Sequence, residues 1–182
     1  MTNELIVVDK VFQSPEQKYI LEYCLDANYH YGEQDNNDTP PTGMVHNIQK
    51  NQKIYQLFSN RINEIYSKYV NGLSLYRMYV NSFSPNEQPY FHNDGEDGFT
   101  VLYYPIGYEW NVNDGGETQF YIDGNLYGVT PEPNRMVLFD ASMLHCAKTF
   151  RNRYRFSIAI KYEWDLCNIR DHNYLSINHI LL

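Results

Sequence analysis

The sequence predicts a mainly β fold with N-terminal helices, namely a double-stranded β-helix (jelly roll) buttressed by two or more α-helices. Before residue 70, two segments carry apolar residues at helical spacing. From Leu73 onward, short β-rich segments alternate with Gly, Pro and Asn. Helices followed by a run of short strands fit this antiparallel arrangement better than an alternating βαβ fold.

The first elements are expected to be a short strand and a helix. Residues 5–12 have the composition of an apolar strand. Ser14 is the expected N-cap, with Pro15 at the first helical position and Gln17 completing a capping box. Apolar residues then recur at helical spacing: Tyr19, Ile20, Tyr23, Cys24 and Ala27.

A second helix is expected over residues 54–69. Its apolar positions again follow helical spacing: Ile54, Leu57, Phe58, Ile62, Ile65, Tyr66 and Tyr69. The two helices are separated by a polar segment whose clearest part is residues 36–41, Asn-Asn-Asp-Thr-Pro-Pro. Such a composition predicts a surface loop.

The remaining chain predicts five strands, at residues 75–81, 99–105, 117–122, 135–139 and 154–162. We therefore expect a single domain, residues 1–182, in which residues 1–72 form a helical support region and residues 73–163 form the catalytic jelly-roll core. Residues 164–182 form a tail. Its apolar side chains are expected to pack on the core, with contact to another subunit as the alternative.

Composition and charge limit the possible partners. The chain has 14 Lys plus Arg against 22 Asp plus Glu, a formal net charge of −8, which disfavours nonspecific nucleic-acid binding. No apolar run is long enough for a membrane span or a secretion signal. The three cysteines form no even set and no CxxC pair, which is typical of free thiols in a reducing compartment. A cytoplasmic protein is therefore expected.

A candidate metal site comes from three residues. His92 and Asp94 are two positions apart, so their side chains share one face of an extended strand. His145 follows the strand-like run 136–139. Two histidines and one carboxylate form the facial triad of non-haem Fe(II) oxygenases, which leaves coordination positions open for a co-substrate and O₂.

A candidate anion site follows the second histidine. Arg155 and Ser157 share one face of the last predicted strand. A guanidinium matches a carboxylate with two parallel hydrogen bonds, and a neighbouring hydroxyl adds a third donor. A metal triad together with this anion clamp indicates 2-oxoglutarate as a co-substrate.

These residues resemble the prolyl 4-hydroxylase branch of the Fe(II)/2-oxoglutarate dioxygenases over residues 75–162. The motifs that carry the resemblance are His92-x-Asp94, Thr100-Val101-Leu102-x-Tyr104, Gly115-Gly116-Glu117-Thr118-x-Phe120, His145, and a basic residue ten positions later, Arg155. The resemblance implies that His92, Asp94 and His145 bind Fe(II). It also implies that 2-oxoglutarate meets a second set of residues: Arg155, Tyr104, Ser157, Thr118 and Tyr79.

The implied activity is that of a procollagen-proline 4-dioxygenase-like hydroxylase. Such an enzyme uses O₂ to hydroxylate prolyl residues of a peptide or protein and converts 2-oxoglutarate to succinate and CO₂. A requirement for ascorbate (vitamin C) is an expectation from the resemblance alone. Two positions depart from the collagen-type pattern, because Arg155 replaces a common lysine and Lys161 replaces a frequent tryptophan. If Lys161 points inward, it could contact an acidic or polar substrate.

Two other functions stay open on the sequence. One is a hydroxylase of a free amino acid or another small molecule, and the other is a non-catalytic jelly roll that binds a metal and a ligand without oxidation. The other four histidines are expected to be structural or surface residues: His30, His46, His172 and His179. Gly115 and Gly116 are expected to adopt positive φ, either in a hairpin turn or in shaping the pocket.

Overall fold

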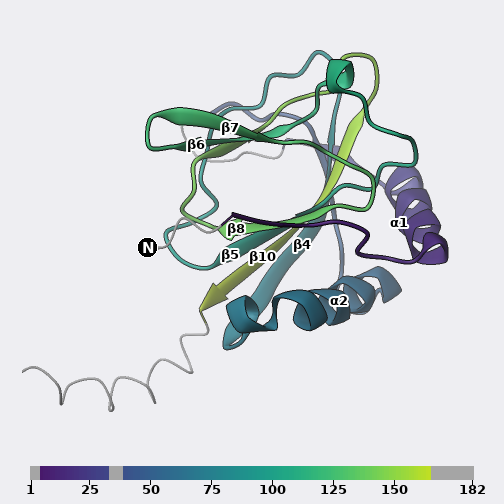
Figure 1. The fold of residues 1–182 in the computed structure, drawn as a ribbon. Coiled ribbons are helices and arrows are strands. Elements are labelled where there is room, and N and C mark those ends of the chain that lie inside the picture. Colours follow the sequence, from purple (N-terminus) through teal and green to yellow (C-terminus); the bar gives the residue numbers. More distant parts are fainter. Residues whose placement is uncertain (1–4, 33–38, 165–182) are drawn as a thin grey trace, which may run out of the picture.

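The computed structural model describes residues 5–32 and 39–164 (Figure 1). Within these ranges lie two α-helices, α1 (Ser14–Asp26) and α2 (Lys53–Val70), and a short 3-10 helix, η1 (Val112–Asp114). The strands are β1 (Leu5–Val8), β2 (His30–Tyr31), β3 (Met44–Asn47), β4 (Leu73–Phe83), β5 (Phe99–Tyr103), β6 (Thr118–Ile122), β7 (Asn125–Val129), β8 (Met136–Asp140), β9 (His145–Ala147) and β10 (Arg155–Trp164). The predicted tail beyond Trp164, with His172 and His179, lies outside the described residues.

The strands form two antiparallel sheets. The seven-stranded sheet has the order β1-β8-β5-β10-β4-β3-β2, and the three-stranded sheet has the order β7-β6-β9. In Figure 1 the hairpin of β6 and β7 lies above the larger sheet, and α2 lies below it. This mainly β arrangement, with helices on one side, confirms the jelly-roll fold predicted from the sequence. Across the residues that the structure describes, no helix is both long enough and apolar enough to cross a membrane.

Helix α1 begins at Ser14, one residue earlier than predicted, because Ser14 was expected to be its N-cap. The N-cap is Gln13, whose backbone N–H donates to the Glu16 carboxylate at 2.9 Å. The Gln17 side chain instead donates to the carbonyl of Phe12, also at 2.9 Å. The prediction of Ser14 as N-cap was therefore wrong, because Glu16 supplies the capping group at this end.

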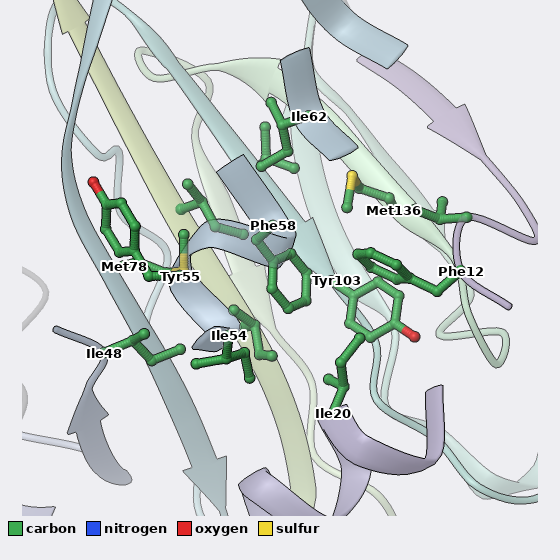
Figure 2. Close-up of a cluster of buried hydrophobic side chains, with 14 of the residues drawn as sticks. Phe12, Ile20, Ile48, Ile54, Tyr55, Phe58, Ile62, Met78, Tyr103 and Met136 are labelled. Atoms are coloured by element: carbon green, nitrogen blue, oxygen red, sulfur yellow. The ribbon is translucent and has the colours of Figure 1, made fainter. Parts of the chain in front are cut away.

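The main apolar core lies between the helices and the larger sheet. Ile54, Phe58 and Ile62 occur four residues apart on α2 and are fully buried. Figure 2 shows these side chains beside Tyr103 of the sheet and Phe12, which precedes α1. The rings of Phe58 and Tyr103 pack edge to face with their centroids 5.3 Å apart. Helix α2 thus supports the outer face of the sheet whose inner face carries the site.

The inner face is set by the strand period of two. Along β10, Ile158 and Ile160 belong to the core under the helices, whereas Ala159 belongs to a second cluster between the sheets. That second cluster also contains Phe120 of β6 and Tyr79 of β4. Polar residues at the same alternate positions therefore point between the two sheets.

Four short strands were not predicted, namely β2, β3, β7 and β9. The 28–47 region, expected as a loop, contains β2 and β3, and β3 pairs with β4 through Val45 and Asn81. These strands have only two to five residues. Whether such a short segment forms a strand depends more on the strand with which it pairs than on its own sequence. His46 is structural, as predicted, since its ring nitrogens contact the Tyr23 hydroxyl and the Asn28 carbonyl, each at 2.9 Å.

Candidate active site

Backbone pairing brings His92 beside His145. The His92 N–H donates to the His145 carbonyl at 2.9 Å, and the His145 N–H donates to the His92 carbonyl at 2.8 Å. These bonds form an isolated β-bridge at the free edge of β9, so the strand predicted around His92 is reduced to one residue pair. Asp94 leaves this edge, because its N–H donates to the Ala141 carbonyl at 2.8 Å. Its side chain nevertheless lies with the two imidazoles.

The ligating atoms of the three predicted metal ligands converge. Asp94 Oδ1 lies 3.7 Å from His92 Nε2, and Asp94 Oδ2 lies 3.6 Å from His145 Nε2. One ligand atom from each residue lies within 4.8 Å of the others. The Nδ1 atoms face the carbonyls of Tyr90 and Met143, at 3.1 and 2.9 Å. Each Nδ1 can thus donate its proton there, which leaves the Nε2 lone pairs for a metal ion.

The charge states of these side chains also suit a metal. Burial lowers the pKa of His145 to about 4, so the imidazole is neutral at neutral pH. Burial alone would raise the pKa of Asp94, but the adjacent Lys161 ammonium, with smaller effects from the neighbouring imidazoles, outweighs it and holds that pKa well below its usual range. A neutral imidazole and an ionised carboxylate are the forms that bind metal ions.

Arg155, at the start of β10, is a buried guanidinium that is 1% exposed. Its Nε donates to the Gly116 carbonyl at 2.9 Å, Nη1 to Ser157 Oγ at 3.1 Å, and Nη2 to Thr118 Oγ1 at 2.9 Å. Each terminal nitrogen carries a second N–H. Within residues 5–32 and 39–164, no carboxylate lies within ion-pair distance of Arg155. Its charge is thus available for an anion.

Tyr104 and Thr118 extend the surroundings of this guanidinium. The Tyr104 hydroxyl lies 2.7 Å from Thr118 Oγ1, and the guanidinium carbon of Arg155 lies 5.6 Å from the centre of the Tyr104 ring. Burial raises the pKa of Tyr104, so its phenol keeps its proton. Tyr79 lies on β4, where the guanidinium carbon of Arg77 lies 4.1 Å from the centre of the Tyr79 ring. The structure therefore groups Ser157, Thr118 and Tyr104 around Arg155.

Gly116 shapes this anion site. Its φ is +88°, and a Cβ there would lie 2.3 Å from the ring of Phe150. The adjacent Gly115 forms an isolated β-bridge with Phe150. The hairpin turn between β6 and β7 instead lies at Asp123 and Gly124. Positive φ was predicted correctly, but the hairpin reading was wrong, and the Gly116 carbonyl binds Arg155 directly.

The two histidines of the triad and the anion site open onto one cavity of about 40 Å³ between the two sheets. Residues from both groups line it, among them His92, His145, Arg155, Ser157, Thr118 and Tyr79. Lys161 lines it as well and points inward, which the alternation along β10 indicated. A metal ion and a carboxylate-bearing ligand could therefore be held side by side.

Thr100 belongs to a motif of the resemblance, but no role in the site was predicted for it. Its hydroxyl donates to Asp94 Oδ2 at 2.5 Å, and Lys161 Nζ lies 3.3 Å from the same hydroxyl. The contact arises because Thr100 on β5 pairs directly with Lys161 on β10. That register depends on the fold, so the motif alone does not show that Thr100 contacts Asp94.

Comparison with known proteins finds similarity in fold among solved structures. No protein-family model and no curated protein matches the sequence. A Pseudomonas putida prolyl-4-hydroxylase matches with a TM-score of 0.71 and 14% identity over 90% of this chain and 94% of that chain. A Trichoplax adhaerens prolyl hydroxylase, in complex with a hypoxia inducible factor oxygen degradation domain peptide fragment, matches with a TM-score of 0.76 and 16% identity over 96% and 88%.

A third similar structure differs in what it binds. HygX from Streptomyces hygroscopicus, with nickel and 2-oxoglutarate bound, matches with a TM-score of 0.69 and 12% identity over 91% of this chain and 84% of that chain. Identities this low establish the architecture and not the reaction. The chain thus has the double-stranded β-helix fold that these 2-oxoglutarate/Fe(II) oxygenases share.

Proposed function

We propose that the chain is an Fe(II)- and 2-oxoglutarate-dependent dioxygenase that hydroxylates a C–H bond. The observation that carries this proposal is a single cavity lined by both histidines of the His-Asp-His triad and by a buried guanidinium that pairs with no carboxylate of the described residues. Each group alone has structural explanations. Their placement in one cavity matches a metal ion and a dicarboxylate bound together.

His92, Asp94 and His145 would hold Fe(II) through the two Nε2 atoms and a carboxylate oxygen. The hydrogen bonds of both Nδ1 atoms to backbone carbonyls would fix the rings in that orientation. When bound, the iron would supply O₂ activation coupled to decarboxylation of 2-oxoglutarate to succinate and CO₂. The two sheets would keep bulk water from the reacting groups.

Arg155 would pair with the carboxylate of 2-oxoglutarate that lies away from the metal. Ser157 and Thr118 already position its terminal nitrogens, so little ordering is needed when the anion arrives. Tyr104 holds Thr118 from the other side, and Tyr79 forms part of the cavity wall. Charge-assisted hydrogen bonds in this dry site would offset the desolvation of the dianion.

Prolyl residues of a peptide or protein are the substrate that we propose first. Two of the similar structures are prolyl hydroxylases, and one of them is in complex with a peptide fragment. The sequence motifs around His92 and His145 also resemble those of the prolyl 4-hydroxylase branch. We further infer a cytoplasmic location, because the three cysteines of the sequence form neither an even set nor a CxxC pair.

A small polar molecule is the second candidate substrate. Lys161 points into the cavity at the position where the prolyl members frequently have tryptophan. One of the similar structures, HygX, is also described with hygromycin B bound. An ammonium has three donors, so the one that remains beyond Asp94 and Thr100 can serve a polar group of a substrate.

The experiment incubates the protein with Fe(II), 2-oxoglutarate and O₂, together with a panel of proline-rich peptides and free amino acids. A prolyl hydroxylase adds one oxygen atom to a proline peptide, and the same peptide with alanine in place of that proline gains none. A small-molecule hydroxylase oxidises a free compound instead. Metal binding without succinate or any oxidised product in the whole panel would favour a non-catalytic binding module and contradict the proposal.

A further inference from the structure

The buried ammonium of Lys161 meets the carboxylate of one expected metal ligand. Lys161 lies on β10 and is only 6% exposed. Its Nζ contacts Asp94 Oδ2 directly, and the Thr100 hydroxyl donates to the same oxygen at 2.5 Å. Lys161 Nζ also lies 3.3 Å from that hydroxyl. Two donors therefore meet at one oxygen of Asp94.

The burial of this lysine must be offset by its surroundings. A buried ammonium loses its hydration, which costs several kcal/mol unless an opposite charge lies close by. Lys161 Nζ has such a charge beside it, because it contacts the Asp94 carboxylate directly. Lys161 is therefore a cation that is held against Asp94.

The two oxygens of Asp94 have different surroundings. Oδ2 accepts from Lys161 and Thr100. Oδ1 lies 3.7 Å from His92 Nε2 and accepts no hydrogen bond from the part of the chain that the structure describes. His145 Nε2 lies 3.6 Å from Oδ2, but the lone pairs of Oδ2 are already used by the two protein donors, whereas those of Oδ1 are not. This asymmetry selects Oδ1 as the oxygen for a metal ion.

We infer that Lys161 is a positioning residue of the metal site, which holds Asp94 Oδ2 so that Oδ1 alone binds the metal, and whose charge weakens the binding of divalent cations. The inference rests on the function proposed above. The triad contributes one negative charge, that of Asp94, and the Lys161 ammonium cancels it. A dication at the triad is repelled by this ammonium at short range, where screening is weak.

The test is a Co(II) titration of the metal-free full chain, followed by visible absorption and calorimetry. Lys161→Met keeps a long apolar stem but removes the charge and the donor. We expect it to bind Co(II) at least about tenfold more tightly than the wild type, because the repulsion is gone. Its absorption spectrum should also change, because Asp94 Oδ2 loses its charged donor and keeps only the Thr100 hydroxyl.

Lys148→Met is the matched control. It makes the same chemical change three residues after His145, at an ammonium that lies 5.9 Å from the ring of Phe91 and not against Asp94. We expect its Co(II) affinity to stay within about twofold of the wild type, because its charge is more exposed to solvent screening. This comparison separates the local effect on Asp94 from the loss of one positive charge.

Lys161→Gln provides a second variant if Lys161→Met does not fold. Its amide keeps a donor for Asp94 Oδ2 without the charge, so Co(II) should bind more tightly with a spectrum close to that of the wild type. The inference is overturned if both Lys161 variants bind Co(II) no more tightly than Lys148→Met. Failure of the wild type itself to bind Co(II) would instead overturn the proposed function.

Discussion

His92 and His145 are joined by two backbone hydrogen bonds, and their imidazole rings lie 4.4 Å apart between centroids. This pairing forms at the edge of the smaller sheet, beside β9. It places two side chains from distant parts of the sequence on one cavity before any ligand is present. Preorganisation of this kind reduces the ordering that metal binding requires.

Replacing Arg155 by methionine should weaken 2-oxoglutarate binding by roughly 2 to 5 kcal/mol, because a buried carboxylate would lose its charged partner. The measurement is an anaerobic calorimetric titration of 2-oxoglutarate into Mn(II)-loaded protein. Arg153→Met is the control, since Arg153 stacks on Tyr108 and lies partly exposed near Asp114. Equal affinities of the two variants would place the carboxylate elsewhere.

Gly116→Ala should disturb the anion site through the backbone. The added Cβ would lie 2.3 Å from the Phe150 ring, so the carbonyl that accepts from Arg155 must shift. We expect a loss of about 1 to 3 kcal/mol in the free energy of unfolding and weaker 2-oxoglutarate binding. Gly124→Ala is the control, because φ is also positive there but nothing lies within 4 Å of its added Cβ. A Gly116 variant that resembles this control in both assays would argue against the role of the carbonyl.

The free energy of unfolding of the metal-free protein should decrease as the pH falls from 6.5 to about 4. In this range His145 is protonated in the unfolded chain but neutral in the folded protein. Burial lowers the pKa of His145 from 6.5 to about 4. Between these values the unfolded chain binds more protons, so the free energy of unfolding decreases as the pH falls. The contribution is at most about 3 kcal/mol.

Urea unfolding at several pH values, with His145→Gln for comparison, measures this contribution. The variant lacks the titrating ring, so its stability should fall less steeply across the same range. Asp94 titrates at lower pH, because its pKa is held below its usual range. Parallel pH profiles of the two proteins would show that His145 does not become protonated on unfolding in this range.

Phe58→Ala should lower the free energy of unfolding by roughly 3 to 5 kcal/mol, because it leaves a cavity under the larger sheet. Phe58 is fully buried and packs on Phe12 and Tyr103, which are held against the same sheet. Leu25→Ala, at a side chain that is 59% exposed, should change stability by less than about 0.5 kcal/mol. Urea denaturation measures both. A cost below about 1 kcal/mol for Phe58→Ala would contradict the core described here.

The features that the sequence predicted well have local signals. Both long helices carry apolar residues at helical spacing, and the longer strands have β-rich composition. The inward direction of Lys161 followed from the strand period of two, because Arg155 lies on the same face of β10. The expected ligands His92 and Asp94 also come together, although the strand expected there is a single bridge.

The features that were missed depend on long-range pairing. Strand β9 has three residues, and the bridge to His92 joins it to a segment that precedes β5. Thr100 reaches Asp94 because β5 lies beside β10 in a particular register. The Gly116 carbonyl reaches Arg155 only after β6 is placed across from β10. Such contacts follow from tertiary packing, which composition and spacing do not report.

Succinate formation from 2-oxoglutarate, under air with added Fe(II), tests the central claim most directly. The comparison is between the wild type and His145→Ala, with the peptide and amino-acid panel present in both. The account predicts succinate from the wild type and none above background from the variant, because the variant lacks one of three metal ligands. Equal succinate from both proteins, or none from a wild type that binds iron, would contradict it.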